Sequence, residues 1–194
     1  MIEIRRATLT DVPDIARVHA KADWETYAAL FGAQAYPLDV VECEQRWLRA
    51  LRDGSVLLVA TDRGVIVGLG RAYADRIGAL YLLAAYRRQG IGKAMLARLL
   101  QALHERGIAQ ARFDVVAINA AAIDFYRAQG ARPVGRCTNR DPRGDTEDLI
   151  FAIATAKAGG VRIGPVAQLD RVPRFERGGC GFKSCRDRQL HLEY

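Results

Sequence analysis

The sequence predicts an α+β (α/β) domain in which helices cover both faces of a mixed, mainly antiparallel central sheet. Two patterns lead to this fold class. Short stretches rich in Val, Ile and Leu are typical of strands, and they alternate with segments in which apolar residues recur every three or four positions, as in amphipathic helices. The chain has 194 residues, 50% of them hydrophobic, which is enough for one well-packed domain and too few for two of ordinary size.

The first quarter of the chain is expected to hold one strand and three helices. Apolar Ile2, Ile4 and Ala7 alternate with charged residues, which indicates a short strand. Polar capping residues and glycines set the helix boundaries, with a proline tolerated in the first turn. The expected helices run from Thr10 or Asp11 to about Trp24, from Glu25 to Phe31, and from Asp39 to Asp53.

Beyond residue 54 the pattern predicts six strands and two helices. Asp62-Arg63-Gly64 makes a tight turn between two stretches rich in Val and Leu, so these stretches are expected to pair as an antiparallel hairpin. Between Gly90 and Glu105 the apolar period changes to about 3.6 residues, and Gly107 ends that helix. The expected strands are 55–61, 65–72, 77–83, 111–117, 132–137 and 149–154, and the second helix runs from Asn119 to Gly130.

Composition argues against several classes of protein. The net charge is +7, yet the sequence has no run of adjacent basic residues interleaved with aromatics, which a nucleic-acid track would need. No window approaches about 20 apolar residues, so a membrane span is not expected. The start of the chain has no apolar signal-peptide stretch, and the four cysteines form no disulfide framework. We therefore expect a soluble, cytoplasmic protein with neither nucleic acid nor membrane as a partner.

The last part of the chain differs in character from the rest. Residues 161–194 have no sustained strand or helix period, so we expect a domain over residues 1–157 and a disordered, dispensable extension over residues 158–194. The possible zinc ligands of that extension are Cys180, Cys185 and His191. Their spacing matches no standard zinc site, so no metal is expected.

A resemblance accounts for the composition of this extension. The stretches 166–172 and 181–184 resemble a conceptual translation of a tRNA gene. Such a reading frame would have entered a neighbouring gene, and its product would not have been selected to fold.

The most informative segment for function runs from Leu80 to Lys93, where a strand leads through a basic, glycine-bearing turn into an amphipathic helix. The first N–H groups of a helix have no partner inside the helix and lie at the positive end of its dipole, so phosphate binds there readily. Gly90 and Gly92 remove the side chains that would keep an anion from the backbone. Arg87, Arg88 and Lys93 add positive charge.

Two common phosphate motifs do not fit this segment. Met95 stands where a dinucleotide-binding fold needs its third glycine, and the residue after Lys93 is not the Ser or Thr of a P-loop. On these residues alone, an ordinary glycine-softened helix start with solvated arginines remains the alternative.

The pattern Arg87-x-x-Gly90-x-Gly92, preceded by Leu80-Tyr81-Leu82, resembles the acetyl-CoA motif of the GNAT N-acetyltransferase superfamily. The resemblance implies the GNAT fold, with backbone amides of the turn holding the diphosphate of acetyl-CoA and the preceding strand bonding its pantetheine arm. The residues that it assigns to the cofactor are Leu82, Leu83, Arg87, Arg88, Gln89, Gly90, Ile91, Gly92 and Lys93. Ala84 departs from the family, in which proline is common at this position.

Asn119-x-x-Ala122-x-x-Phe125-Tyr126-x-x-x-Gly130 resembles the second GNAT signature, about 30 residues further on. The resemblance implies that Asn119 contacts the cofactor and that Tyr126 is the acid that protonates the departing CoA thiolate. A phenol, with a pKa near ~10, can donate to a sulfur with a pKa near ~8.5. The alternatives are a half-buried core tyrosine and a plain helix cap.

The acceptor side is less specified. In this fold the acceptor pocket lies between the first helices and the loop before the last strand. The first region offers Trp24, Glu25, Tyr27 and Phe31, and Tyr81 lies on the strand before the turn. That strand carries no acid, so the base stays open between a water chain, Asp75, Glu25 and Tyr81. The polar residues of the loop are Asn139, Asp141, Asp145, Glu147 and Asp148.

The resemblance thus implies transfer of an acetyl group from acetyl-CoA to a primary amine on a small molecule or peptide. The amine would attack directly, because neither motif contains a cysteine to form an acyl-enzyme. The alternative is a catalytically silent acetyl-CoA-binding sensor or partner module, which the missing strand carboxylate favours. GNAT domains often dimerise, so a homodimer is a further expectation.

Overall fold

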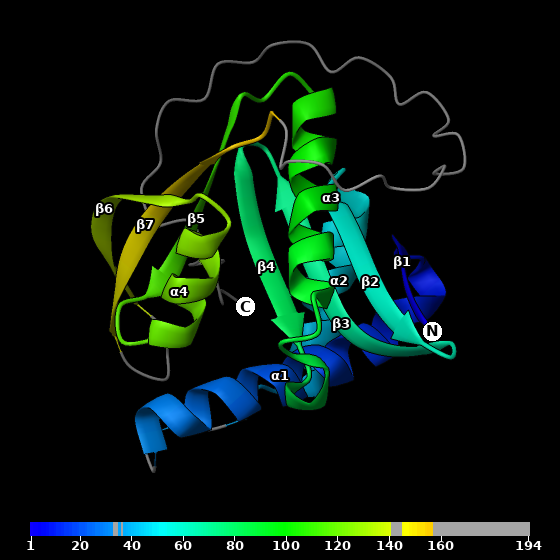
Figure 1. Cartoon of the computed structure of the whole chain (residues 1–194). Helices are drawn as coiled ribbons and strands as arrows, with labels where there is room; N and C mark the ends of the chain where they lie inside the picture. The colour runs from blue at the N-terminus through cyan, green and yellow to red at the C-terminus, as the bar shows by residue number, and fades with distance from the viewer. Residues whose placement is uncertain (33–34, 36, 141–144, 157–194) are drawn as a thin grey trace, which may run out of the picture.

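The computed structural model describes residues 1–32, 35, 37–140 and 145–156 (Figure 1). The elements are β1 (Ile2–Arg6), α1 (Val12–Phe31), α2 (Val40–Arg52), β2 (Val56–Asp62), β3 (Val65–Tyr73), β4 (Arg76–Leu82), α3 (Ile91–Glu105), β5 (Gln110–Val116), α4 (Ala120–Ala128), β6 (Arg132–Asn139) and β7 (Thr146–Ala154), with 3-10 turns η1 (Leu9–Asp11) and η3 (Ala84–Tyr86). The extension expected at 158–194, with its two cysteines and His191, lies outside the described residues, so the proposed domain boundary stays a prediction.

The strands and the last three helices agree with the expected ranges to within a few residues. The hairpin between β2 and β3 has the predicted tight turn, in which Arg63 and Gly64 both have positive φ, 49° and 82°. This is the backbone conformation that a two-residue type I′ turn requires.

The prediction of two separate helices before residue 32 is wrong. The structure has one continuous helix, α1, from Val12 to Phe31, with no break near Trp24 or Glu25. Nothing between Pro13 and Gly32 ends a helix, since this stretch holds neither glycine nor a second proline. Gly32 has a positive φ of 56° and ends α1.

Within the described residues the seven strands form one sheet in the order β1-β2-β3-β4-β5-β7-β6. All neighbours are antiparallel except β4 and β5, which run parallel and are joined by the single pair Arg76–Arg112. Beyond that pair the two strands diverge toward their carboxyl ends, as Figure 1 shows in its lower half. The predicted mixed, mainly antiparallel sheet is confirmed, and it has an open gap between its two central strands.

Helices cover both faces of the sheet, as the sequence predicted. Figure 1 shows α3 and α4 on the near face and α2 behind it. Alternate residues of β2 divide between the two cores, because successive side chains on a strand point to opposite faces. Val56 and Leu58 pack with α3, and Leu57 and Val59 pack with α1 and α2.

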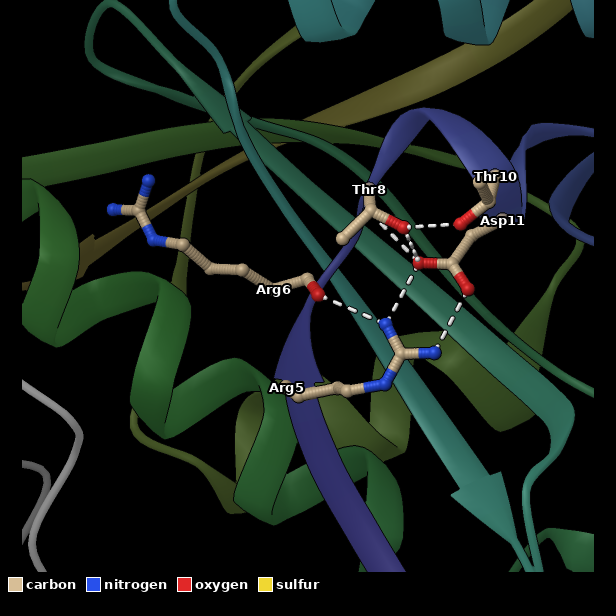
Figure 2. A network of polar contacts seen from close by, with 5 residues as sticks. All are labelled: Arg5, Arg6, Thr8, Thr10 and Asp11. Atoms are coloured by element: carbon tan, nitrogen blue, oxygen red, sulfur yellow. Dashed lines mark hydrogen bonds and ion pairs between the residues drawn. The ribbon is translucent and has the colours of Figure 1, made fainter.

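The beginning of α1 is held against β1 by a compact polar network (Figure 2). The guanidinium of Arg5 donates to both carboxylate oxygens of Asp11, at 2.7 and 2.8 Å. The same carboxylate accepts from the backbone N–H of Thr8 at 2.7 Å and from its hydroxyl at 2.9 Å. The hydrogen bond from Arg5 is the main reason that the pKa of Asp11 lies well below its usual range. Asp11 precedes α1 as expected, but its side chain bonds Arg5 and Thr8 and does not cap the helix.

Candidate active site

A groove of about 1500 Å³ occupies the gap between β4 and β5. Residues of α1, α2, α3 and α4 line it together with both strands, so it reaches both faces of the sheet. It contains the ends of both sequence motifs, with Gly90 and Gly92 on one side and Asn119 and Tyr126 on the other. The two sequence motifs, about 30 residues apart in the chain, therefore lie on the two sides of the gap that the diverging strands leave. Ligands commonly bind at the carboxyl ends of parallel strands.

The turn before α3 presents unpaired backbone donors. Ala94 N–H is the first that closes a helical bond, to Gly90 O at 3.0 Å. None of the amides from 88 to 93 donates to a protein acceptor among the described residues. Arg88 and Gly90 have left-handed φ values of 61° and 81°, and turns of this kind form anion-binding concavities of N–H groups. The turn has the unpaired amides that the sequence leads us to expect, and phosphate binding by them stays a prediction.

The two glycines of the turn have different reasons to be glycine. A Cβ at Gly90 would meet open space, so its requirement is the left-handed φ. Gly92 has an ordinary φ, and a Cβ there would lie 3.4 Å from Leu82 Cδ1 and 3.6 Å from Phe125 Cζ, at ordinary contact distance. Its missing side chain leaves the first turn of α3 bare toward the groove.

The three basic residues of the turn do not share one role. Arg88 and Lys93 are exposed, line the groove and form no ion pair within the described residues. Arg87 also lines the groove, but its guanidinium is occupied by protein groups: Nε donates to Leu82 O at 3.0 Å, and Nη2 reaches Thr26 Oγ1 at 3.2 Å. Arg88 and Lys93 are therefore the cations free to face an anion.

The edge of β4 that faces the gap is open beyond Arg76. Leu83 N–H donates to Val67 O at 3.0 Å, so the backbone groups of Leu82 point away from β3 and toward the gap. Within the described residues no strand pairs with this edge from Ile77 to Leu82. Leu82 lines the groove, whereas the Leu83 side chain packs with the α1–α2 core. The Leu82 carbonyl oxygen accepts from Arg87 Nε, so Leu82 is the residue of the predicted pair whose N–H can meet an extended ligand.

Tyr126 is half-buried on α4, with its ring against Phe113 at 4.2 Å between centroids and against Phe125 at 5.0 Å. Its hydroxyl has no hydrogen-bond partner among the described residues, and the residue lines the groove. Burial raises the pKa of Tyr126 well above its usual range, with a smaller contribution from Tyr27. The phenol therefore stays protonated at neutral pH and can donate a proton or hydrogen bond into the groove.

Asn119 has the capping role that the sequence allowed. Its Oδ1 accepts from Ala122 N–H at 3.1 Å at the beginning of α4, and the residue also lines the groove. The cap uses the carbonyl oxygen, so the side-chain amide N–H₂ remains as a donor.

Sequence reasoning missed Asp114. This residue lies on β5, lines the groove and has a side chain only 9% exposed. Its Oδ2 accepts from Arg76 Nη2 at 2.5 Å, and its Oδ1 is buried with no partner in the part of the chain that the structure describes. The strand pattern could have placed it: Ala111, Phe113 and Val115 face the α3 core, so Asp114 faces the opposite side. What the pattern lacked was the gap between the strands.

The predicted acceptor residues separate into two groups. Tyr27 and Tyr81 line the groove; the Tyr27 ring stacks on Phe31 at 5.7 Å, and the Tyr81 ring meets His19 at 4.7 Å. Trp24 is 40% exposed and does not line it. Glu25 does not line it either, because its carboxylate accepts from Ala84 N–H at 2.6 Å.

The remaining predicted residues follow the same division. Asn139, Asp145 and Asp148 line the groove, Glu147 pairs with Arg136 on the surface, and Asp141 lies outside the described residues. Asp75 is exposed and away from the groove. Gln89 folds back onto Ala85 O, and Ile91 is a core residue, so only their backbone amides belong to the turn.

In the part of the chain that the structure describes, no three His, Cys, Asp or Glu side chains are arranged to hold a metal ion. No helix within these residues is long and apolar enough to cross a bilayer.

Comparison with known proteins gives a consistent result. The model of the Acetyltransferase (GNAT) family matches residues 19–131. The chain is 29% identical over 138 residues, 66% of its length, to YuaI of Bacillus subtilis, an uncharacterized N-acetyltransferase of which the match covers 79%. It is 47% identical over 67 residues to the Escherichia coli [Ribosomal protein bS18]-alanine N-acetyltransferase, covering 34% of this chain and 45% of that enzyme.

A solved structure has the same fold. The PaiA N-acetyltransferase of Thermoplasma acidophilum, crystallised with coenzyme A, matches with a TM-score of 0.64 at 20% identity, over 79% of this chain and 99% of that one. Since the family model spans more than half of the 194 residues and contains the turn before α3 and all of α4, the chain belongs to the GNAT family of acetyltransferases.

Proposed function

We propose that this protein transfers an acetyl group from acetyl-CoA to a primary amine by direct attack. One observation carries the proposal: Arg88, Gly90, Gly92 and Lys93, whose amides have no acceptor among the described residues, line the same groove as Tyr126, whose hydroxyl has no partner among them either. The coenzyme A bound to the Thermoplasma enzyme of the same fold supports the choice of cofactor.

In this proposal the amides of the turn bind the diphosphate, and the positive charges of Arg88 and Lys93 attract the negative charge of the diphosphate. The open edge of β4 at Leu82 bonds the amides of the pantetheine arm, as an exposed strand edge bonds an added strand. Asn119 donates from its free amide. These groups lie on β4, α3 and α4, so they direct the arm along the gap toward Tyr126.

Tyr126 then acts as the general acid. Its phenol is kept protonated by burial and donates to the sulfur as the thiolate leaves. The described cysteines support direct attack by the amine. The Cys43 thiol is buried, which raises its pKa to about 11, and Cys137 does not line the groove. Neither is placed to form an acyl-enzyme.

Asp114 is the group that we propose for the acceptor side. Asp114 lines the groove, and its Oδ1 is buried with no hydrogen-bond partner among the described residues, so an ammonium or amine N–H that reaches this enclosed oxygen would satisfy it. As a carboxylate beside the reacting amine it can take the proton that the amine must lose. The absence of an acid from β4 was the reason to consider a silent module, and a carboxylate on β5 weakens that reason.

Calorimetry with acetyl-CoA, followed by a thiol-release assay, tests the function. The acceptor panel holds a peptide that begins with alanine, a peptide with a blocked amino end and one lysine, a polyamine and an aminoglycoside. The relative that acts on ribosomal protein bS18 alanine makes the first peptide worth including. We expect micromolar binding and release above background for at least one class. No acetyl-CoA binding would contradict the proposal. Binding without release for any amine would leave the silent module.

A further inference from the structure

A side-chain network ties the phosphate turn to α1. Glu25, in the second half of α1, accepts from the backbone N–H of Ala84 at 2.6 Å. The same carboxylate oxygen lies 3.5 Å from Nη2 of Arg87. Ala84 is the first residue of η3, so Glu25 caps the 3-10 turn that links β4 to the anion-binding amides.

Arg87 completes the network from the other side. Its Nε donates to Leu82 O at 3.0 Å, at the end of β4. Its Nη2 reaches Thr26 Oγ1 at 3.2 Å and Ala22 O at 3.4 Å, both on α1. One guanidinium therefore joins the last residue of a strand to two successive turns of a helix.

The turn has another anchor, Tyr86, which packs against the α3 core and whose hydroxyl reaches Asp62 Oδ2 at 3.5 Å. The other two residues of η3, Ala84 and Ala85, are exposed. Arg88, two residues after η3, lies in the left-handed region, which costs about 1 kcal/mol for a residue with a side chain. A short exposed segment that contains a strained residue needs outside contacts to keep one conformation.

We propose that Glu25 and Arg87 are positioning residues for the cofactor. They fix the turn against α1 so that the amides of residues 88–93 face the groove, and Arg87 is not itself a ligand of the diphosphate. This inference rests on the proposed function. It reassigns Glu25, which the sequence placed at the acceptor, and Arg87, which the sequence placed at the phosphate.

The same stretch of α1 also reaches the acceptor side of the groove. Asp23 and Tyr27 line the groove, and they flank Glu25 in the sequence. A movement of this helix turn is therefore transmitted to the phosphate turn through Glu25 and Arg87. Through this network, α1 contacts both the phosphate turn and the acceptor side of the groove.

Removal of the Glu25 charge distinguishes a positioning role from simple electrostatics, because the two predict opposite changes in the affinity for the anionic cofactor. Loss of a negative charge near an anion site tightens anion binding if only charge matters. Loss of the acceptor for Ala84 N–H weakens anion binding if Glu25 is needed to fix the conformation of the turn. With coenzyme A as the calorimetric probe, we expect Glu25→Ala to raise Kd about tenfold, and Glu25→Gln, which keeps a neutral acceptor, about threefold.

Glu44→Ala, which removes a carboxylate from α2 outside the groove, is the matched control and leaves Kd within about twofold. Unfolding midpoints without ligand show whether each variant is folded. If Glu25→Ala does not fold, the Kd of Glu25→Gln tests the positioning role. An unchanged or lower Kd in the folded Glu25 variants overturns the inference alone. A wild-type protein that does not bind coenzyme A overturns the proposed function with it.

Discussion

Arg76 at the beginning of β4 donates from Nη2 to Oδ2 of Asp114 on β5, at 2.5 Å, close to the single pair that joins the two strands. This bond lies at the closed end of the gap. It occupies one carboxylate oxygen and leaves Oδ1 buried without a partner among the described residues. In the proposed function, Asp114 is the carboxylate that the amine meets at this end of the groove.

Asp114→Asn tests that placement. The amide keeps the shape of the side chain but cannot take a proton, so kcat/KM for the best amine is expected to fall about 100-fold. Binding of acetyl-CoA should change less than about twofold, because the turn before α3 is untouched. Asp75→Asn, at an exposed residue that was an alternative base, is the control and should keep its activity. A full loss in Asp75→Asn with none in Asp114→Asn would reverse the assignment.

Tyr126→Phe removes the proposed acid and leaves the ring that packs on Phe113 and Phe125. We expect kcat to fall at least about 100-fold with little change in the Kd of acetyl-CoA. A lowered kcat that recovers fully with an activated thioester of low leaving-group pKa would fit the same role. Equal kcat values for both proteins would exclude it.

The pH dependence follows from the raised pKa of Tyr126. The active form is protonated, and activity is lost only as pH rises through the folded pKa. Since that pKa lies above the usual value of about 10, kcat should show no basic decline from this residue between about pH 6 and about pH 9. A rate profile under saturating substrates checks this, and a decline near neutral pH that disappears in Tyr126→Phe would contradict it.

Gly92→Ala should affect stability and binding in opposite directions. Its φ is compatible with alanine and the new Cβ meets Leu82 and Phe125 at ordinary contact distance, so the free energy of unfolding should rise by about 0.5 kcal/mol. The methyl group covers amides that face the groove, so the Kd of acetyl-CoA should rise about tenfold. Gly90→Ala is the contrast: its left-handed φ should cost about 1 kcal/mol of stability. Denaturant unfolding and calorimetry on both variants measure the two effects.

Asp11→Asn should destabilise the protein in a pH-dependent way. The folded pKa of Asp11 is lowered by Arg5 and Thr8, so its contribution is present above the unfolded pKa of about 4 and is lost as pH falls through the folded pKa. We expect a cost of about 1–2 kcal/mol at neutral pH and a smaller one near about pH 3.

Asp14→Asn is the control for that change. Asp14 pairs with Arg17 on the surface, where both side chains are more than half exposed, so the cost should stay below about 0.5 kcal/mol. Urea unfolding at both pH values compares the two variants. A cost for Asp11→Asn that is the same at both pH values would show that its charge is not the cause.

Most helices and strands could be predicted from the sequence, because each has its own pattern of apolar residues and its own boundary residues. α3 follows from a run of apolar residues with a helical period between two glycines, and the β2–β3 hairpin follows from the Arg63-Gly64 turn. The failure at α1 has a local cause too: the apolar stripe of the first stretch reaches only to about Trp24, which suggested a second helix from Glu25, although no residue between Pro13 and Gly32 ends one.

Asp114 and Glu25 show where such rules stop. The sequence alone determined the order of the strands and, apart from the division of α1 into two, of the helices, as well as the bare amides of the turn and the tyrosine of α4, because these depend on neighbours along the chain. Only the tertiary structure decided that β4 and β5 diverge, that a buried carboxylate on β5 faces the gap, and that Glu25 supports the turn across 59 residues of chain. These depend on which side chains meet through space, and that is set by how the helices and the sheet pack together.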